Sequence, residues 1–423
     1  MALNRLKKIS DENKVLIQNF SSLSILQFSN YLFPLIAFPY LVRVLGPEKF
    51  GLVNFAAAFV GYFTVLVDYG FNLSATQEIS VHRNESGKID EIFSGVMIVK
   101  SSLFLVGFII FSLLVLSIPK FSVDAPVYFL SFLAVSGSVV FPTWFFQGME
   151  KMKYITVITI GVKILWVVSV FLLIKSPSHI LLYVLLNGIS LILTGLIALL
   201  FIFRKFGIKM YFPPLTVIKR LLVEGWYVFV STASITLYTS TNIFILGLFA
   251  GNEIVGYFAA ADKIRIAVQG LFQNASQAIF PYLSKLFVES KEKAISFVKK
   301  YLKLSLSFAI VVTFVLFAFS GEIVLLILGE KYMQSINVFR IIIFLPLIIL
   351  LSNVYGIQIM LNLGYKKEFF RIIFLAGIIN LILSFILVPV YFETGTAVAV
   401  LITEIFVTAG MYGFVRKKKI LEL

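Results

Sequence analysis

Charged side chains inside long apolar stretches are the residues of this sequence most able to do chemistry. A charge at membrane depth is costly unless it faces a wet cavity or a partner, so each one is a candidate functional group. Basic groups at that depth could bind an anion through charge-assisted hydrogen bonds. The candidate substrate-binding cations are Lys163, Arg265, Arg340, Lys100 and Arg43.

The depth of each cation separates two interpretations. Lys163 lies about eight residues into its apolar stretch, roughly 12 Å deep at about 1.5 Å per residue, which favours a cavity cation over snorkelling. Lys100 and Arg43 lie nearer to the ends of their stretches, where snorkelling to the headgroups is at least as good an interpretation as a ligand role. For Arg340 both interpretations stand.

Acidic and amide side chains at similar depth are expected to line the same cavity. Asp68 lies near the middle of its stretch and Glu404 well inside the last one, so each must be protonated, paired or hydrated. Either could bind a proton or Na⁺, and no other cofactor is expected. The full set of cavity-lining and ion-coupling candidates is Asp68, Asp262, Glu404, Asn72, Gln269, Gln273, Asn30 and Gln147.

Several of these residues recur at helical spacing and form polar stripes. The clearest stripe comprises Asp262, Arg265, Gln269, Gln273, Ser276 and Gln277. Two alternatives stay open: interhelical hydrogen bonding in a dry bundle, and an ion pair of Asp262 with Arg265 or Lys263 on the same helix. Thinner stripes comprise Asn54, Thr64, Asp68, Asn72 and Thr76, and Ser231, Ser234, Tyr238 and Thr241.

The elements that must position these residues are transmembrane helices. Of 423 residues, 60% are hydrophobic and 13% are charged, which is far from the composition of a soluble chain. Apolar stretches of about 20 residues recur along the chain, and each is long enough to span the hydrocarbon as a helix. The sequence predicts an all-α polytopic membrane protein with spans at 17–45, 52–78, 95–118, 126–147, 155–174, 180–203, 224–249, 255–284, 304–321, 335–362, 372–390 and 396–415.

Basic residues are concentrated in alternate connections between these spans. One side of the predicted topology holds 26 of the 36 Lys and Arg residues, and the opposite loops hold four. By the positive-inside rule both termini are cytoplasmic, and the N-terminal apolar stretch is expected to be retained. The net charge of +15 is thereby explained without nucleic acid, since juxtamembrane cations contact anionic lipid headgroups.

The chain is predicted to consist of two six-helix lobes, 1–210 and 211–423, around a central cavity. The connection from Arg204 to Val223 holds Pro213-Pro214 and lies near the middle of the sequence. A G-x-E-x-x-G pattern occurs at Gly46–Gly51 and again at Gly251–Gly256, each time between the first two spans of a half. Six helices per half give parallel repeats about an axis along the membrane normal.

Metal-dependent and thiol chemistry are not expected. The chain has no cysteine, and its two histidines, His82 and His179, lie far apart in sequence. No metal site is predicted.

Five segments resemble the Wzx-type polysaccharide flippases of the multidrug/oligosaccharidyl-lipid/polysaccharide exporter superfamily. The strings P-Y-L-V-R-V-L-G at 39–46 and W-F-F-Q-G-M-E-K-M at 144–152 are the most specific. The segments at 68–72, 261–264 and 328–332 agree in order, so the likeness covers nearly the whole chain.

This resemblance implies a function as well as a fold. Such proteins move undecaprenyl-diphosphate-linked oligosaccharides from the inner to the outer leaflet of the bacterial cytoplasmic membrane by alternating access, for O-antigen and other surface polysaccharides. The implied partners are that lipid-linked substrate, membrane lipid, and polysaccharide polymerase and chain-length proteins. A diphosphate carries negative charge, and a hydrated cationic cleft lowers the cost of moving it.

Two other functions remain as alternatives. A multidrug or organic-cation exporter of the same superfamily would need an acidic and aromatic lining, whereas the basic residues within the spans outnumber the deep acids. A membrane enzyme of polysaccharide assembly would carry a large outer loop and an acid–base constellation, which the sequence lacks. We therefore expect a transporter that is not an enzyme.

Overall fold

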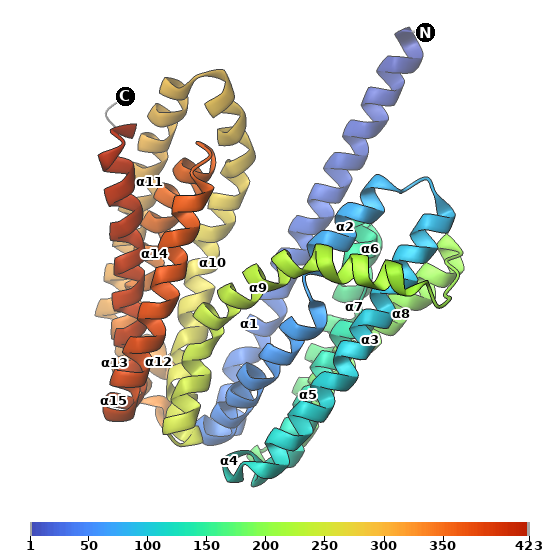
Figure 1. The fold of residues 1–423 in the computed structure, drawn as a ribbon. Helices are drawn as coiled ribbons and strands as arrows, with labels where there is room; N and C mark the ends of the chain where they lie inside the picture. Colours follow the sequence, from blue (N-terminus) through green and yellow to red (C-terminus); the bar gives the residue numbers. More distant parts are fainter. Residues whose placement is uncertain (1, 421–423) are drawn as a thin grey trace. The chain divides into compact units, whose positions relative to one another are not determined.

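The structure is a computed structural model that describes residues 2–420, with the side chains of 2–17, 20, 23, 24, 31 and 234–240 left out. Helices make up this range almost entirely (Figure 1). The apolar sequence explains the helical content, because an apolar segment in lipid must satisfy its backbone hydrogen bonds internally, and an α-helix does so. The helices are α1 (Ala2–Asp68), α2 (Phe71–Val81), α3 (Ser86–Ser117), α4 (Pro119–Ser122), α5 (Ala125–Val140), α6 (Thr143–Gly148), α7 (Met152–Leu173), α8 (Ile180–Phe206), α9 (Leu215–Phe249), α10 (Asn252–Glu289), α11 (Lys291–Ala318), α12 (Ser320–Leu328), α13 (Ser335–Ile342), α14 (Leu345–Ser352), the π-helix η3 (Asn353–Leu361) and α15 (Lys366–Lys417).

Two of these elements are pairs of helices joined at a sharp kink. The backbone of α1 is non-helical at Gly46 (φ 72°, ψ 170°), and that of α15 is non-helical at Phe392 (φ 44°, ψ −121°). Within residues 2–420, eight helical stretches are long and apolar enough to cross a membrane, and two of them contain these kinks. With α10 and the second half of α9, which carry more polar residues, the described chain makes the twelve helical passes predicted from its sequence.

By its contacts the chain divides into two compact units. Unit 1 comprises Met1–Leu45 and Ala56–Thr236, and unit 2 comprises Gly46–Phe55 and Leu237–Leu423. The division falls inside α9, after the Pro213-Pro214 connection. The lobe boundary at residue 210 describes the membrane topology and stays a prediction.

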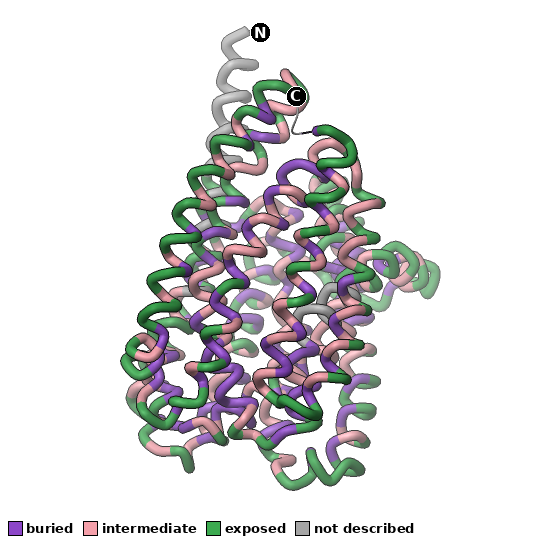
Figure 2. Tube along the Cα trace, turned by 90° about the vertical axis from the view of Figure 1, so that its left-hand side faces the viewer, coloured by how far each residue is buried: buried purple, intermediate pink, exposed green. Residues whose placement is uncertain are grey.

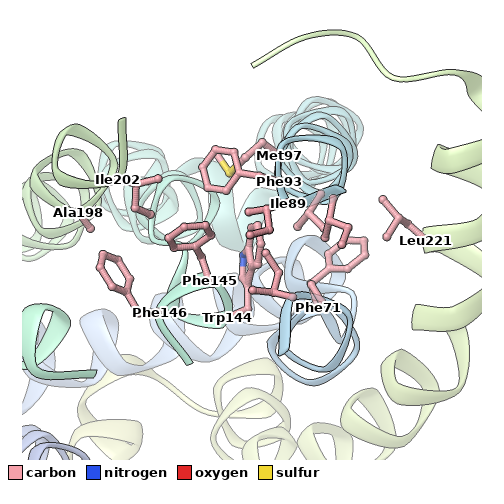
Figure 3. Packing of buried hydrophobic residues seen from close by; sticks show 14 of the residues in the cluster. Phe71, Ile89, Phe93, Met97, Trp144, Phe145, Phe146, Ala198, Ile202 and Leu221 are labelled. Carbon is pink, nitrogen blue, oxygen red and sulfur yellow. The ribbon is translucent and has the colours of Figure 1, made fainter. Parts of the chain in front are cut away.

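The core of unit 1 is built around the aromatic string at 144–146. Trp144, Phe145 and Phe146 are completely buried, and they pack against Phe93 of α3 and Ile202 of α8 (Figure 3). Elsewhere buried and exposed residues alternate around most helices, as expected for helices packed on one side (Figure 2). Most of the W-F-F-Q-G string therefore belongs to the hydrophobic core, and packing explains why these residue types occur there.

Within unit 2 the repeated glycine pattern is explained by a close helix approach. A Cβ at Gly51 would lie 1.7 Å from the Asn252 carbonyl oxygen, and one at Gly256 would lie 2.0 Å from the Pro47 carbonyl oxygen. The second glycine of each repeat therefore contacts the backbone of the other repeat. Only glycine allows so close an approach.

Substitution of either glycine is expected to destabilise the protein. Gly51→Ala or Gly256→Ala forces the two backbones apart, an overpacking that should cost about 3 kcal/mol or more. Thermal unfolding in detergent checks this. The matched control is Gly251→Ala, because a Cβ there meets no heavy atom within 4 Å, and equal stability of all three variants would contradict the packing role.

Candidate functional site

Unit 1 brings together two of the predicted site residues, Lys163 of α7 and Asn30 of α1. The Lys163 Nζ donates to Asn30 Oδ1 over 2.6 Å, although the two residues are 133 positions apart in sequence. The lysine is half-buried, and among the described side chains no carboxylate forms an ion pair with it. Its partner is neutral, so its positive charge is not compensated locally and can attract an anion.

Lys100 of α3 occupies a different environment. Its side chain is 2% exposed, and its Nζ donates to Asp68 Oδ1 over 2.9 Å and to the Ser138 carbonyl oxygen over 2.7 Å. The snorkelling interpretation of Lys100 is therefore wrong: a lysine that reaches the headgroups would be exposed. Asp68 is paired, as a carboxylate at that depth requires.

The Lys100 contacts join two helix ends. Asp68 is the last residue of α1, and the chain then turns through Tyr69 (φ 43°) and Gly70 (φ 78°) into α2. Ser138 lies near the end of α5, just before the break at Pro142 that separates α5 from α6. The lysine thus connects the ends of α1 and α5, next to both breaks, to the continuous helix α3.

In unit 2 three residues of the polar stripe of α10 form one bonded group. The Arg265 Nε donates to Asp262 Oδ1 over 2.6 Å, and its Nη1 donates to Gln269 Oε1. The Arg265 and Asp262 side chains are 13% and 17% exposed. The intrahelical ion pair considered from the sequence is confirmed, so the charge of Arg265 is compensated in this structure.

The other predicted residues are placed separately. Arg340 of α13 is exposed, and its Nε donates to Ser320 Oγ over 2.8 Å. Gln147 of α6 accepts from Thr76 Oγ1 of α2 over 3.4 Å. Arg43 and Asn72 are exposed and Gln273 and Glu404 are half-buried, while Ser234 and Tyr238 lie outside the described side chains.

Two arginines of unit 1 form contacts that the sequence did not reveal. Arg220 of α9 pairs with Glu78 of α2 over 3.1 Å and with Glu91 of α3 over 3.5 Å. Arg83 pairs with Glu150 over 2.8 Å and donates to the Gly148 carbonyl oxygen over 3.0 Å. In the sequence both arginines count only among the loop cations that set the membrane orientation. Their spacing in the sequence does not indicate their acidic partners.

Unit 2 also buries amide groups that were not predicted as site residues. Gln358 of the π-helix η3 is completely buried, and its Nε2 donates to the Ser276 carbonyl oxygen over 2.8 Å. Asn380 donates to Thr403 Oγ1 over 3.3 Å. The Oε1 of Gln358 and the Oδ1 of Asn380 have no donor among the described residues. Buried polar atoms without partners are uncommon, and π-helices often occur at functional sites.

Comparison with known proteins identifies relatives over nearly the whole length. A protein of Escherichia coli (strain K12) named "Putative O-antigen transporter" is 36% identical over 404 residues, covering 96% of this chain and 97% of that protein. A protein of the same name from Shigella dysenteriae is 31% identical over 395 residues, covering 93% and 98%.

Solved structures share the fold at low sequence identity. An inward-facing multidrug resistance MATE family transporter of the MOP superfamily superposes with a TM-score of 0.71 at 14% identity, covering 96% of this chain and 99% of that one. The lipid II flippase MurJ, in an inward closed conformation, superposes with a TM-score of 0.70 at 16% identity, covering 94% and 89%. The all-α fold is thus that of MOP superfamily transporters.

A model of a protein family also matches this chain. It is described as polysaccharide biosynthesis protein, and it matches residues 16–287, which is more than half of the chain. The matched range includes Lys163, Lys100, Asp262 and Arg265. The chain belongs to the polysaccharide biosynthesis protein family.

Proposed function

We propose that this protein is a flippase that moves polyprenyl-diphosphate-linked oligosaccharides from the inner to the outer leaflet of the bacterial cytoplasmic membrane. The family and the relatives named for O-antigen transport support this substrate class. The fold shared with MOP transporters supports alternating access as the mode of movement. The product would serve surface polysaccharide assembly.

One observation carries the choice of an anionic substrate. Lys163 lies at membrane depth with an uncompensated positive charge, held in place by the neutral Asn30 side chain. A lysine charge at that depth with no carboxylate partner costs free energy, and a bound anionic ligand would lower that cost. A diphosphate offers several acceptor oxygens and negative charge, and both would be satisfied by the Nζ.

Arg265 would take part at a different stage. Its pairing with Asp262 lowers the cost of a buried guanidinium while no substrate is bound. A phosphate group that binds Arg265 would compete with Asp262, and the displaced carboxylate could then take up a proton or Na⁺. Arg43, Arg340, Asn72, Gln273 and Glu404 remain proposed lining or coupling residues. Lys100 is buried in its pair with Asp68, so we propose a positioning role for it instead of substrate binding.

The proposed cellular setting follows from charge and hydropathy. In the predicted topology 26 of the 36 basic residues lie on one side, which supports cytoplasmic termini. The protein acts as a carrier without catalysing a covalent step. Polysaccharide polymerase and chain-length proteins are its proposed partners in the membrane.

A reconstituted system tests the function directly. The purified protein is placed in vesicles that contain a fluorescent polyprenyl-diphosphate oligosaccharide, and an added impermeable reagent destroys the fluorophores of the outer leaflet. Without flipping, about half of the signal is protected; with the protein we expect the protected fraction to fall well below half. Vesicles with Lys163→Gln serve as the matched control.

The same vesicles separate the two transporter functions. Uptake of a lipophilic cation, with no movement of the diphosphate lipid, would overturn the proposal in favour of a multidrug exporter. Movement of a neutral polyprenyl lipid at the same rate would show that the diphosphate is not recognised.

A further inference from the structure

The first half of α9, residues 215–236, is a helix with two different faces within unit 1. One face packs against α2 and α3. Leu221 is 3% exposed, and its Cδ1 lies 2.6 Å from where a Cβ at Gly95 would be. Phe229 stacks on Tyr69 with ring centroids 4.9 Å apart, and Val228 fills the space beside Gly70. This inner face is part of the unit 1 core.

Polar contacts hold the same segment in place. Arg220 pairs with Glu78 and Glu91, as described above. In the preceding loop the Lys209 backbone NH donates to Asp90 Oδ1 over 3.0 Å, and that of Tyr211 donates to Ser94 Oγ over 3.2 Å. The segment is thus fixed on the ends of α2 and α3, which the charge distribution places at the cytoplasmic side.

The opposite face is exposed and apolar. Val223, Trp226, Tyr227 and Val230 follow one another at spacings of three, one and three residues, which aligns them on one side of a helix. Their exposed fractions are 59%, 50%, 78% and 42%. At about 100° per residue this stripe lies roughly opposite to Leu221, Gly225 and Val228. Phe212 and Leu215, at 88% and 82%, extend the apolar surface toward the preceding loop.

The orientation and the charges indicate what covers this stripe. The first half of α9 runs across α3 and α8 of unit 1 instead of along them (Figure 1). Because α3 and α8 span the membrane, a helix that crosses them lies near the membrane plane. The span predicted at 224–249 would then begin later, in the second half of α9. Exposed basic residues flank the stripe at Lys209 and Lys219, and one exposed acid, Glu224, lies beside it. Trp and Tyr beside lysines are typical of helices at a bilayer interface.

We propose that the outer stripe of α9 is buried in the headgroup and upper acyl region of the cytoplasmic leaflet, with Lys209 and Lys219 on anionic headgroups. The lipid surface covers apolar area that would otherwise be exposed to water, and the inner face ties that anchorage to unit 1. In the proposed transport cycle, α9 would then anchor unit 1 to the cytoplasmic leaflet and restrict its movement relative to the bilayer. The location of the stripe can be measured whether or not the flippase function is correct.

Tryptophan fluorescence tests the location. The chain has three tryptophans, of which Trp144 is completely buried and Trp166 half-buried, so Trp144→Phe with Trp166→Phe leaves Trp226 as the only tryptophan, which is excited selectively over the tyrosines. In vesicles containing phosphatidylglycerol we expect strong quenching by lipids brominated near the headgroup, weaker quenching by lipids brominated deep in the chain, and little by iodide. Quenching by iodide alone would overturn the proposal, because the stripe would then face water or a protein. Strongest quenching by the deep bromines would overturn it too, because the segment would then span the membrane.

A second measurement avoids reliance on the tryptophan variants. The chain has no cysteine, so Tyr227→Cys gives a single site for a nitroxide label. We expect its accessibility to oxygen and to a water-soluble nickel complex to be intermediate between two references. Leu165→Cys, on the exposed mid-part of α7, reports the deep bilayer, and Val288→Cys, 88% exposed at the end of α10, reports water. A Tyr227 label that matches Val288 would contradict the proposal.

Discussion

Replacing Lys163 with glutamine is expected to reduce delivery of the lipid-linked glycan to the outer leaflet by about 10- to 100-fold. The substitution removes a charge-assisted hydrogen bond to the diphosphate, worth about 1.5–3 kcal/mol. Lys163→Arg keeps the charge and should retain most of the delivery. The measurement is surface glycan in cells whose only copy of the gene encodes the variant, normalised to the amount of protein in the membrane.

The matched control lies on the same helix. Lys153 is exposed near the start of α7, and Lys153→Gln should leave delivery unchanged. Asn30→Ala should give an intermediate loss, because it frees the lysine side chain without removing its charge. Normal delivery by Lys163→Gln at normal abundance would show that the anion is bound elsewhere.

Replacing Lys100 with methionine is expected to destabilise the protein by about 3 kcal/mol. Removing one partner of a buried ion pair leaves the other charge without compensation, which typically costs about 3–5 kcal/mol. The lower end applies because the Asp68 side chain is 28% exposed. Thermal unfolding in detergent and the abundance of the protein in the membrane both measure the effect.

The double variant separates pairing from packing. Lys100→Met with Asp68→Asn removes both charges, and it should recover most of the lost stability because no unpaired carboxylate is left. Lys163→Met provides the contrast, since its partner is neutral and its stability cost should be small. Equal losses in the single and double variants would mean that the ion pair contributes little.

Most of the candidate site residues could be predicted from the sequence, but which of them contact each other could not. Asp262 and Arg265 lie three residues apart on one helix, so their ion pair follows from helical geometry alone. Lys163 and Asn30 are 133 residues apart, and Lys100 contacts groups 32 and 38 residues away. Such contacts depend on how each helix is rotated and shifted against its neighbours, which periodicity within one helix does not fix.

The sequence by itself determined the number of helical passes, their all-α character and the presence of basic groups at membrane depth. These features follow from hydropathy, which is a local sum over about 20 residues. Only the tertiary structure decided that Lys100 is compensated by Asp68 while Lys163 has the neutral Asn30 as its partner. It also decided that the second glycine of each G-x-E-x-x-G pattern contacts the backbone of the other pattern and that one face of α9 is exposed. The physical reason is that the environment of a buried charge is set by side chains from other helices, and these meet only when the helices pack.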